Sequence, residues 1–251
     1  MNGKMTSAMP IVYPESDGQP MADNTKQFRW IVTIQGGIDA LFVDQPDVFV
    51  AGDLLWYPVE GRPDIRVAPD VLVAFGRPKG DRGSYLQWKE QNIPPQVVFE
   101  VMSPNNTVAE MKRKLAFYEK YGVEEYYLYD PDRGSILAWQ RKDDLLVTID
   151  AHGWVSPRLG VRFELHGEDL ELYRPDGDRF VHYVDAILTH VRERKALRQE
   201  HLRAEQEYLR AEQESRRAEQ ESRRAEQEHQ RVERMAAKLR ALGIDPENDI
   251  P

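Results

Sequence analysis

The chain of 251 residues contains no cysteine. This absence excludes disulfide bonds, thiolate metal sites and a cysteine nucleophile. Its six histidines are scattered along the sequence, a distribution that favours neither a zinc site nor a serine–histidine catalytic triad. Together these two features exclude most catalytic classes.

Long apolar runs are also missing, since no stretch approaches the roughly 18 consecutive apolar residues of a membrane-spanning helix. The first twenty residues lack the apolar centre of a secretory signal, so we expect a cytoplasmic protein with no membrane partner. The net charge of -9 argues against a protein that coats nucleic acid through its overall field. A local basic patch remains compatible with that charge.

The chain is long enough, at 41% hydrophobic residues, for one core of roughly 150 to 200 residues and an accessory segment. Near residue 191, short apolar runs punctuated by glycine and proline give way to a seven-residue repeat. Gly243 and Pro246 are expected to stop the helix that this repeat predicts. We predict four parts: a loosely ordered leader at 1–22, a main domain at 23–190, a helical tail at 191–242 and a C-terminal end at 243–251.

Heptads such as RAEQESR predict a long helix in the tail. One heptad column runs from Leu197 to Leu239 and is mostly alanine, whereas the companion column from His201 to Ala236 is mostly polar. Two interpretations remain open. The tail is either a single solvated helix supported by spaced Glu–Arg pairs, or a weak alanine-lined coiled coil that forms a homo-oligomer through residues 195–242.

The first 190 residues indicate a mixture of helices and short strands. A helix, or a pair of helical segments broken at Gly36-Gly37, is predicted over 23–43. A second helix is predicted from the capping-box pattern at Thr107 to Gly122. Strands are predicted at 47–57, 70–75, 96–102, 125–130, 135–139, 145–149, 161–165 and 169–173. This order predicts an α/β (α+β) fold, a mixed sheet flanked by helices, with a long C-terminal helix or coiled coil.

A carboxylate interrupts the strand-like run VVFEVMSP at residues 97–104. Because a single buried charge costs several kcal/mol unless it is paired or bound to a cation, Glu100 needs a partner. Asp70 opens the neighbouring apolar run DVLVAF, and two carboxylates at adjacent strands repel each other unless a cation lies between them. Carboxylate oxygens suit Mg²⁺ (or Mn²⁺), which in such a site activates water and stabilises charge on a phosphodiester.

A cationic partner for this acid pair is expected on the following helix. The residue that shares the face of Glu100 two positions later is Met102, not lysine. Lys114 lies three residues after Met111 and four before Tyr118, which places it at the edge of the stripe that packs on the sheet. Its ammonium group is therefore predicted to reach Glu100 and a bound phosphate.

Three segments carry a resemblance to a known family: Pro69-Asp70, EVMSP from Glu100, and KLAFYEKYGVEEYYLYDP from Lys114. Over residues 23–175 the chain is similar to the Uma-type (Uma2 family) restriction endonucleases, a branch of the PD-(D/E)xK nuclease superfamily. The resemblance implies a restriction-endonuclease-like fold that acts on DNA, with Asp70 and Glu100 as Mg²⁺ ligands. It also implies that Lys114 replaces the catalytic lysine that usually follows the glutamate by two positions. The family's N-terminal acidic segment has no clear counterpart here, and Asp23 is the nearest candidate.

The loop GRPKGDRGSYLQWKE from Gly76 combines cations with aromatic residues. Such a mixture is found in loops that hold a nucleic-acid backbone, and also in flexible solvated loops. The candidate nucleic-acid-binding residues are Arg77, Lys79, Arg82 and Lys89.

Two functions remain open on the sequence alone. The first is a Mg²⁺-dependent endodeoxyribonuclease, a hydrolase in which Asp70, Glu100 and Lys114 are catalytic. The second is a catalytically inactive nuclease-like binding or scaffold protein that forms homo-oligomers through its core or its tail.

Overall fold

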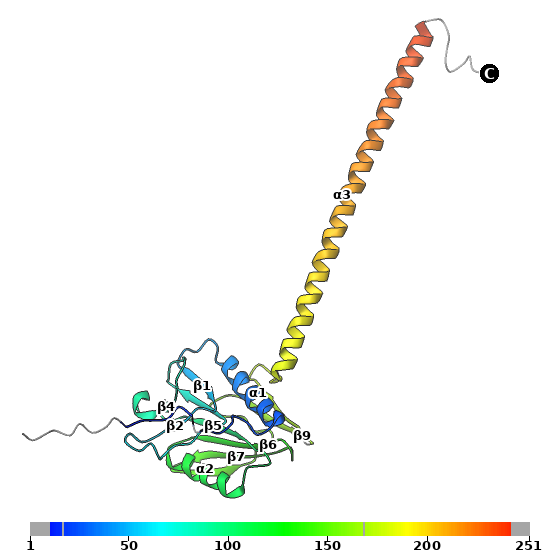
Figure 1. Cartoon of the computed structure of the whole chain (residues 1–251). Helices are drawn as coiled ribbons and strands as arrows, with labels where there is room; N and C mark the ends of the chain where they lie inside the picture. Colours follow the sequence, from blue (N-terminus) through cyan, green and yellow to red (C-terminus); the bar gives the residue numbers. More distant parts are fainter. Residues whose placement is uncertain (1–10, 17, 168, 242–251) are drawn as a thin grey trace, which may run out of the picture. The chain divides into compact units, whose positions relative to one another are not determined.

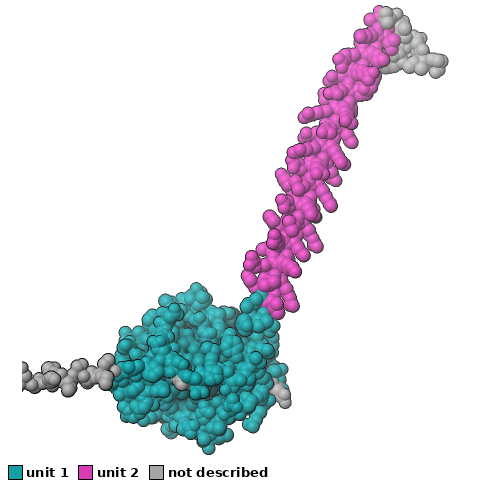
Figure 2. Space-filling view, viewed as in Figure 1, with its two compact units in different colours: residues 1–187 teal, residues 188–251 magenta. Residues whose placement is uncertain are grey.

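The computed structural model describes residues 11–16, 18–167 and 169–241. The chain divides into two compact units, residues 1–187 and residues 188–251 (Figure 2). The long helix α3 (Tyr183–Ala241) begins before the predicted start of the tail at residue 191. The predicted stop at Gly243 and Pro246 and the predicted C-terminal end at 243–251 lie outside the described residues.

A six-stranded sheet forms the centre of the first unit, with the strand order β1-β3-β5-β6-β7-β8. Neighbouring strands are antiparallel except for β5 and β6, which are parallel and are joined by the crossover helix α2 (Val108–Lys120). The predicted mixed sheet flanked by helices is therefore confirmed. The six strands are β1 (Val48–Gly52), β3 (Val71–Phe75), β5 (Val97–Val101), β6 (Glu125–Asp130), β7 (Ser135–Lys142) and β8 (Leu145–Ile149).

Two small sheets and a 3-10 helix complete this unit. β2 (Trp56–Tyr57) pairs in parallel with β4 (Tyr85–Leu86), and β9 (Arg162–His166) pairs antiparallel with β10 (Asp169–Tyr173). The 3-10 helix η1 covers Gln87–Glu90. The single strand predicted at 47–57 is wrong, because the chain turns between β1 and β2 with Asp53 in the left-handed region at φ 48°.

Helices cover both faces of the six-stranded sheet, with α1 (Thr25–Leu41) and α2 on opposite sides (Figure 1). Val97, Phe99 and Val101 of β5 pack in the cluster that includes the α1 side chains, whereas Val98 packs in the cluster that includes those of α2. Alternation along a strand therefore places Glu100 on the face that α2 covers. Burial on both faces explains the unbroken apolar character of β5.

α1 is one continuous helix, so the single-helix alternative is confirmed and the break at Gly36-Gly37 is wrong. A β-carbon at Gly37 would lie 2.3 Å from the ring of Phe180, so the glycine permits close packing of that ring on the helix. The helix begins at its N-cap Asn24, whose side chain accepts hydrogen bonds from the N–H groups of Lys26 and Gln27.

α2 begins with the predicted capping box, which is confirmed. The Thr107 hydroxyl accepts a hydrogen bond from the Glu110 N–H, and the Glu110 carboxylate accepts one from the Thr107 N–H. The helix ends before Gly122, which adopts φ 93°. Met111 and Tyr118 are its buried residues, as expected for the stripe that faces the sheet.

Two residues of the predicted loosely ordered leader, Tyr13 and Pro14, contact the main domain. The Tyr57 hydroxyl donates to the carbonyl of Pro14 at 2.7 Å, and the rings of Tyr13 and Tyr57 lie 5.3 Å apart between centroids. Residues 1–10 and 17 of that prediction lie outside the described residues. Within the described ranges, no helix combines the length and apolar character needed to cross a membrane.

Candidate active site

The predicted acid pair is brought together by the pairing of β3 with β5. The antiparallel register places Val71 opposite Phe99, so one further step places Asp70 opposite Glu100. The Oδ2 atom of Asp70 accepts a hydrogen bond from the N–H of Val101 at 2.6 Å. Both carboxylates therefore lie at one end of the sheet, on the face that α2 covers.

Glu100 is 2% exposed, and both of its carboxylate oxygens have partners on α2. Nζ of Lys114 donates to Oε2 at 2.7 Å, and the hydroxyl of Tyr118 donates to Oε1. Lys114 and Tyr118 are four residues apart, so they project from the same side of the helix. An ion pair and a second hydrogen bond are what a buried carboxylate requires. The predicted contact between Lys114 and Glu100 is present.

Burial and the charges in this group shift the pKa of three of its members, Asp70, Lys114 and Tyr118. Burial, followed by the charge of Glu100, raises the pKa of Asp70 well above its usual value, and the nearby Lys114 opposes this shift. Burial is the largest single effect on Lys114 and lowers its pKa, but Glu100 and Asp70 together raise the pKa above the ordinary lysine value. Lys114 is therefore a stable cation at neutral pH.

A cavity of about 390 Å³ lies beside this group and includes Asp70 and Lys114 in its wall. Asp23, the acid weighed from the sequence, also lines the cavity and accepts a hydrogen bond from the Ser103 hydroxyl. Gln27 joins α1 to β5, because its Nε2 donates to the carbonyl of Val101 at 2.8 Å. Asp70, Lys114 and the start of α1 thus meet at one cavity.

Three further residues at this site were missed by sequence reasoning. Asp53 and Gln27 line the cavity from the turn after β1 and from α1, and no local pattern marks them. Tyr118 was counted only as a member of the apolar stripe of α2, although its spacing of four from Lys114 could have indicated a shared partner.

The carboxylate oxygens of Asp70 and Glu100 are the type of ligand that a hard divalent cation such as Mg²⁺ prefers. Among the described residues, no three histidine, aspartate or glutamate side chains are arranged to hold a metal ion. Mg²⁺, however, is commonly held by one or two carboxylates, with water and substrate phosphates as its other ligands. Asp70 and Glu100 supply the two carboxylates that such a site needs.

Tyr118 and Tyr126 offer a matched pair for testing how Glu100 is held. Their rings lie 5.0 Å apart, and both are fully buried, yet the Tyr126 hydroxyl has no hydrogen-bond partner among the described residues. We expect Tyr118→Phe to lower the free energy of unfolding by about 1.5–3 kcal/mol, because a buried carboxylate loses a donor. Tyr126→Phe should be neutral or stabilising, since it removes an unpaired hydroxyl. Urea unfolding of the full chain measures both, and equal losses would contradict this role of Tyr118.

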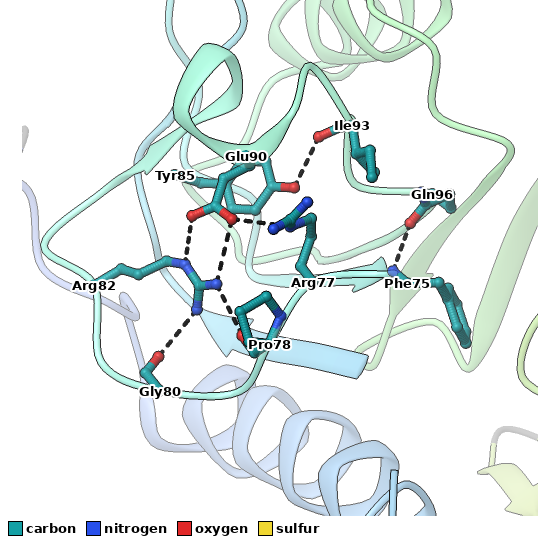
Figure 3. A network of polar contacts seen from close by, with 9 residues as sticks. All are labelled: Phe75, Arg77, Pro78, Gly80, Arg82, Tyr85, Glu90, Ile93 and Gln96. Atoms are coloured by element: carbon teal, nitrogen blue, oxygen red, sulfur yellow. Dashed lines mark hydrogen bonds and ion pairs between the residues drawn. The ribbon is translucent and has the colours of Figure 1, made fainter. Parts of the chain in front are cut away.

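The predicted nucleic-acid-binding loop is built around an internal ion-pair network (Figure 3). Oε1 of Glu90 lies 2.7 Å from Nε of Arg82, and Oε2 lies 3.1 Å from Nε of Arg77. Arg77 is 8% exposed, and the guanidinium of Arg82 lies over the ring of Phe49 at 3.8 Å from its centroid. Arg77 and Arg82 are therefore held by contacts within the chain, and their role in binding nucleic acid stays a prediction.

The rest of this loop is also held in place. Arg82 donates to the carbonyls of Pro78 and Gly80, and the Tyr85 hydroxyl donates to the carbonyl of Ile93 (Figure 3). These hydrogen bonds hold the loop to the rest of the domain, in contrast to the flexible solvated loop that was the alternative interpretation. Nζ of Lys79 lies 2.6 Å from Oδ1 of Asp39. Lys89 is exposed, and a contact between it and nucleic acid stays a prediction.

Comparison with known proteins gives two findings. The model of the Uma2 family, described as "Putative restriction endonuclease", matches residues 33–166, a span that contains Asp70, Glu100 and Lys114. No curated protein matches the chain. Among solved structures, the crystal structure of "a putative nuclease belonging to DUF820" from Anabaena variabilis is similar, with 16% sequence identity and a TM-score of 0.41. That match covers 59% of this chain and 84% of the other.

Proposed function

Because the chain belongs to the Uma2 family, we propose that it is a metal-dependent endonuclease that hydrolyses phosphodiester bonds in DNA. One observation carries the proposal: Asp70, Glu100 and Lys114 converge from two strands and a helix beside one cavity. This is the set of groups that phosphodiester hydrolysis needs, two acids for a cation and one fixed positive charge.

Each residue has a separate task in this proposal. Asp70 and Glu100 would hold Mg²⁺ or Mn²⁺, which when bound supplies an activated water and stabilises negative charge on the phosphate. Lys114 remains protonated, so its ammonium group orients the water or stabilises the charge that develops on the phosphate. Tyr118 is a positioning residue, since it holds the second oxygen of Glu100 and touches no reacting atom.

A second candidate function rests on the same contacts. Lys114 and Tyr118 occupy both oxygens of Glu100, so the buried carboxylate is compensated without any metal. Such a network also suits a catalytically inactive nuclease-like protein that binds nucleic acid or serves as a scaffold. The two candidates differ in whether the acid pair takes up a divalent cation.

The full chain should convert supercoiled plasmid and linear DNA to shorter products when Mg²⁺ or Mn²⁺ is present, and EDTA should abolish the reaction. Parallel reactions with single-stranded RNA test the substrate class. Calorimetric titration of each metal, without nucleic acid, measures binding at the acid pair. Cleavage of RNA alone would contradict the DNA assignment. Failure to cleave either nucleic acid, together with absence of metal binding, would favour the inactive scaffold.

A further inference from the structure

Between residues 200 and 234, the acidic side chains of α3 are confined to two sides of the helix. Ten glutamates lie between residues 200 and 234, and every one belongs to one of two heptad columns. The first column runs from Glu200 to Glu228 and the second from Glu205 to Glu233, with glutamate at every seventh position. α3 is helical throughout this stretch, so each column forms a continuous stripe.

The two glutamate stripes flank a pair of adjacent columns, one of them mostly alanine. At 3.6 residues per turn, the column from Leu197 to Leu239 and its companion from His201 to Ala236 lie side by side. In heptad terms these two columns are the d and a positions, and the glutamate stripes are e and g. We call the a and d columns together the α3 seam. An arginine column from Arg203 to Arg231 lies beyond the g stripe, away from the seam.

The glutamates are available for contacts with another molecule. Within the helix, Arg216 pairs with Glu212 at 2.6 Å and Arg231 approaches Glu228 at 3.8 Å. Ion pairs of this exposed kind contribute little to stability, so giving them up costs little. The side chains of the seam are themselves exposed, as Leu197 at 69% and Val232 at 56% illustrate.

A second copy of the chain is a poor occupant for the α3 seam. In a parallel pair the g residues of one helix face the e residues of the other, and in an antiparallel pair e faces e and g faces g. Both arrangements place glutamate against glutamate over the whole stretch. Alanine and serine knobs bury little apolar area to offset that repulsion. The predicted homo-oligomer through residues 195–242 therefore lacks complementary charge, whereas one through the core stays a prediction.

We propose that the α3 seam binds a partner α-helix that carries lysine or arginine on both flanks of its own seam. Charge complementarity identifies this occupant, because basic e and g residues would face every glutamate of the two stripes. Small residues in the seam let the partner's backbone approach closely. This interaction surface is independent of the nuclease chemistry of the first unit.

A charge-exchanged peptide tests the proposal on the full chain. The peptide has the sequence of residues 197–240 with every glutamate replaced by lysine and every arginine by glutamate, and the control peptide keeps the native sequence. Calorimetry should show 1:1 binding of the exchanged peptide, tighter than the native one by more than about thirtyfold, since each opposite-charge pair contributes about 1.5- to 2-fold. High salt should weaken it. Equal binding of the two peptides, or binding of neither, would overturn the proposal.

Two chain variants locate the contact. Replacing the second glutamate column by glutamine, from Glu205→Gln to Glu233→Gln at every seventh residue, should weaken binding of the exchanged peptide by about tenfold. The matched control replaces the arginine column from Arg203 to Arg231 by glutamine and should leave binding unchanged. Circular dichroism of each variant confirms that α3 remains helical. If the arginine variant loses more affinity for the exchanged peptide than the glutamate variant does, the contact lies on the arginine side of α3 and the proposal is refuted.

Discussion

Glu100→Gln is expected to reduce metal-dependent DNA cleavage by at least about 10²–10³-fold. The substitution keeps the shape of the side chain but removes the charge that would hold the metal with Asp70. The same change leaves Lys114 without its ion-pair partner, so some stability is lost as well. Initial cleavage rates at saturating Mg²⁺, together with calorimetric metal binding, measure the effect.

Glu125 supplies the matched control for this experiment. It is also buried, at 1% exposure, and lies in the adjacent strand β6, but it is held by Tyr127, Ser156 and the N–H of Arg158 on the other face of the sheet. Glu125→Gln should therefore cost stability while cleavage and metal binding stay near the original values. If cleavage survives Glu100→Gln and Asp70→Asn alike, the acid pair is not the catalytic centre. If Glu125→Gln abolishes it equally, the loss reflects folding rather than chemistry.

Glu90→Ala is expected to lower the free energy of unfolding by about 3–5 kcal/mol. Glu90 is the shared partner of Arg77 and Arg82, and the side chains of all three are only 10% to 13% exposed. Removing the carboxylate leaves two largely buried guanidinium groups without their anion, and Nη1 of Arg77 already lacks a partner among the described atoms. Urea unfolding of the full chain, followed by circular dichroism, provides the measurement.

The exposed pair of Arg62 with Asp64 serves as the comparison. Its atoms lie 2.6 Å apart, but the side chains are 56% and 61% exposed. Solvent screening should leave Asp64→Ala with little or no loss of stability. A loss in Glu90→Ala no larger than that would show that the loop tolerates unpaired cations and does not depend on the network in Figure 3.

Patterns of neighbouring residues in the sequence predicted those helix ends and strands that depend on contacts between residues close in sequence. The capping box fixed the start of α2, and the apolar run around Glu100 identified β5 because both faces of that strand are buried. Asp70 and Lys114 could be inferred because a buried carboxylate demands nearby partners and few were placed to supply them. The resemblance to the Uma2 family added their expected roles.

Features that depend on distant segments could not be predicted in this way. Gly37 was interpreted as a helix breaker because its packing partner, Phe180, lies far along the chain. Arg77 and Arg82 were named as candidate nucleic-acid contacts from the composition of their loop, which does not reveal that both turn inward toward one carboxylate. Gln27 contacts β5 across 74 positions in sequence, a separation that no helix or strand period reports.

The charges around Glu100 have a further consequence for the proposed binding of a cation. Two carboxylates are opposed there by the single positive charge of Lys114, and the raised pKa of Asp70 favours a proton on that side chain. With that proton the three groups are electrically neutral. A divalent ion that binds to Asp70 must displace the proton, so its affinity falls as the pH drops below the pKa of Asp70. One proton would thus leave the site for each metal ion that binds. The fraction of occupied sites would depend on the pH as well as on the metal concentration.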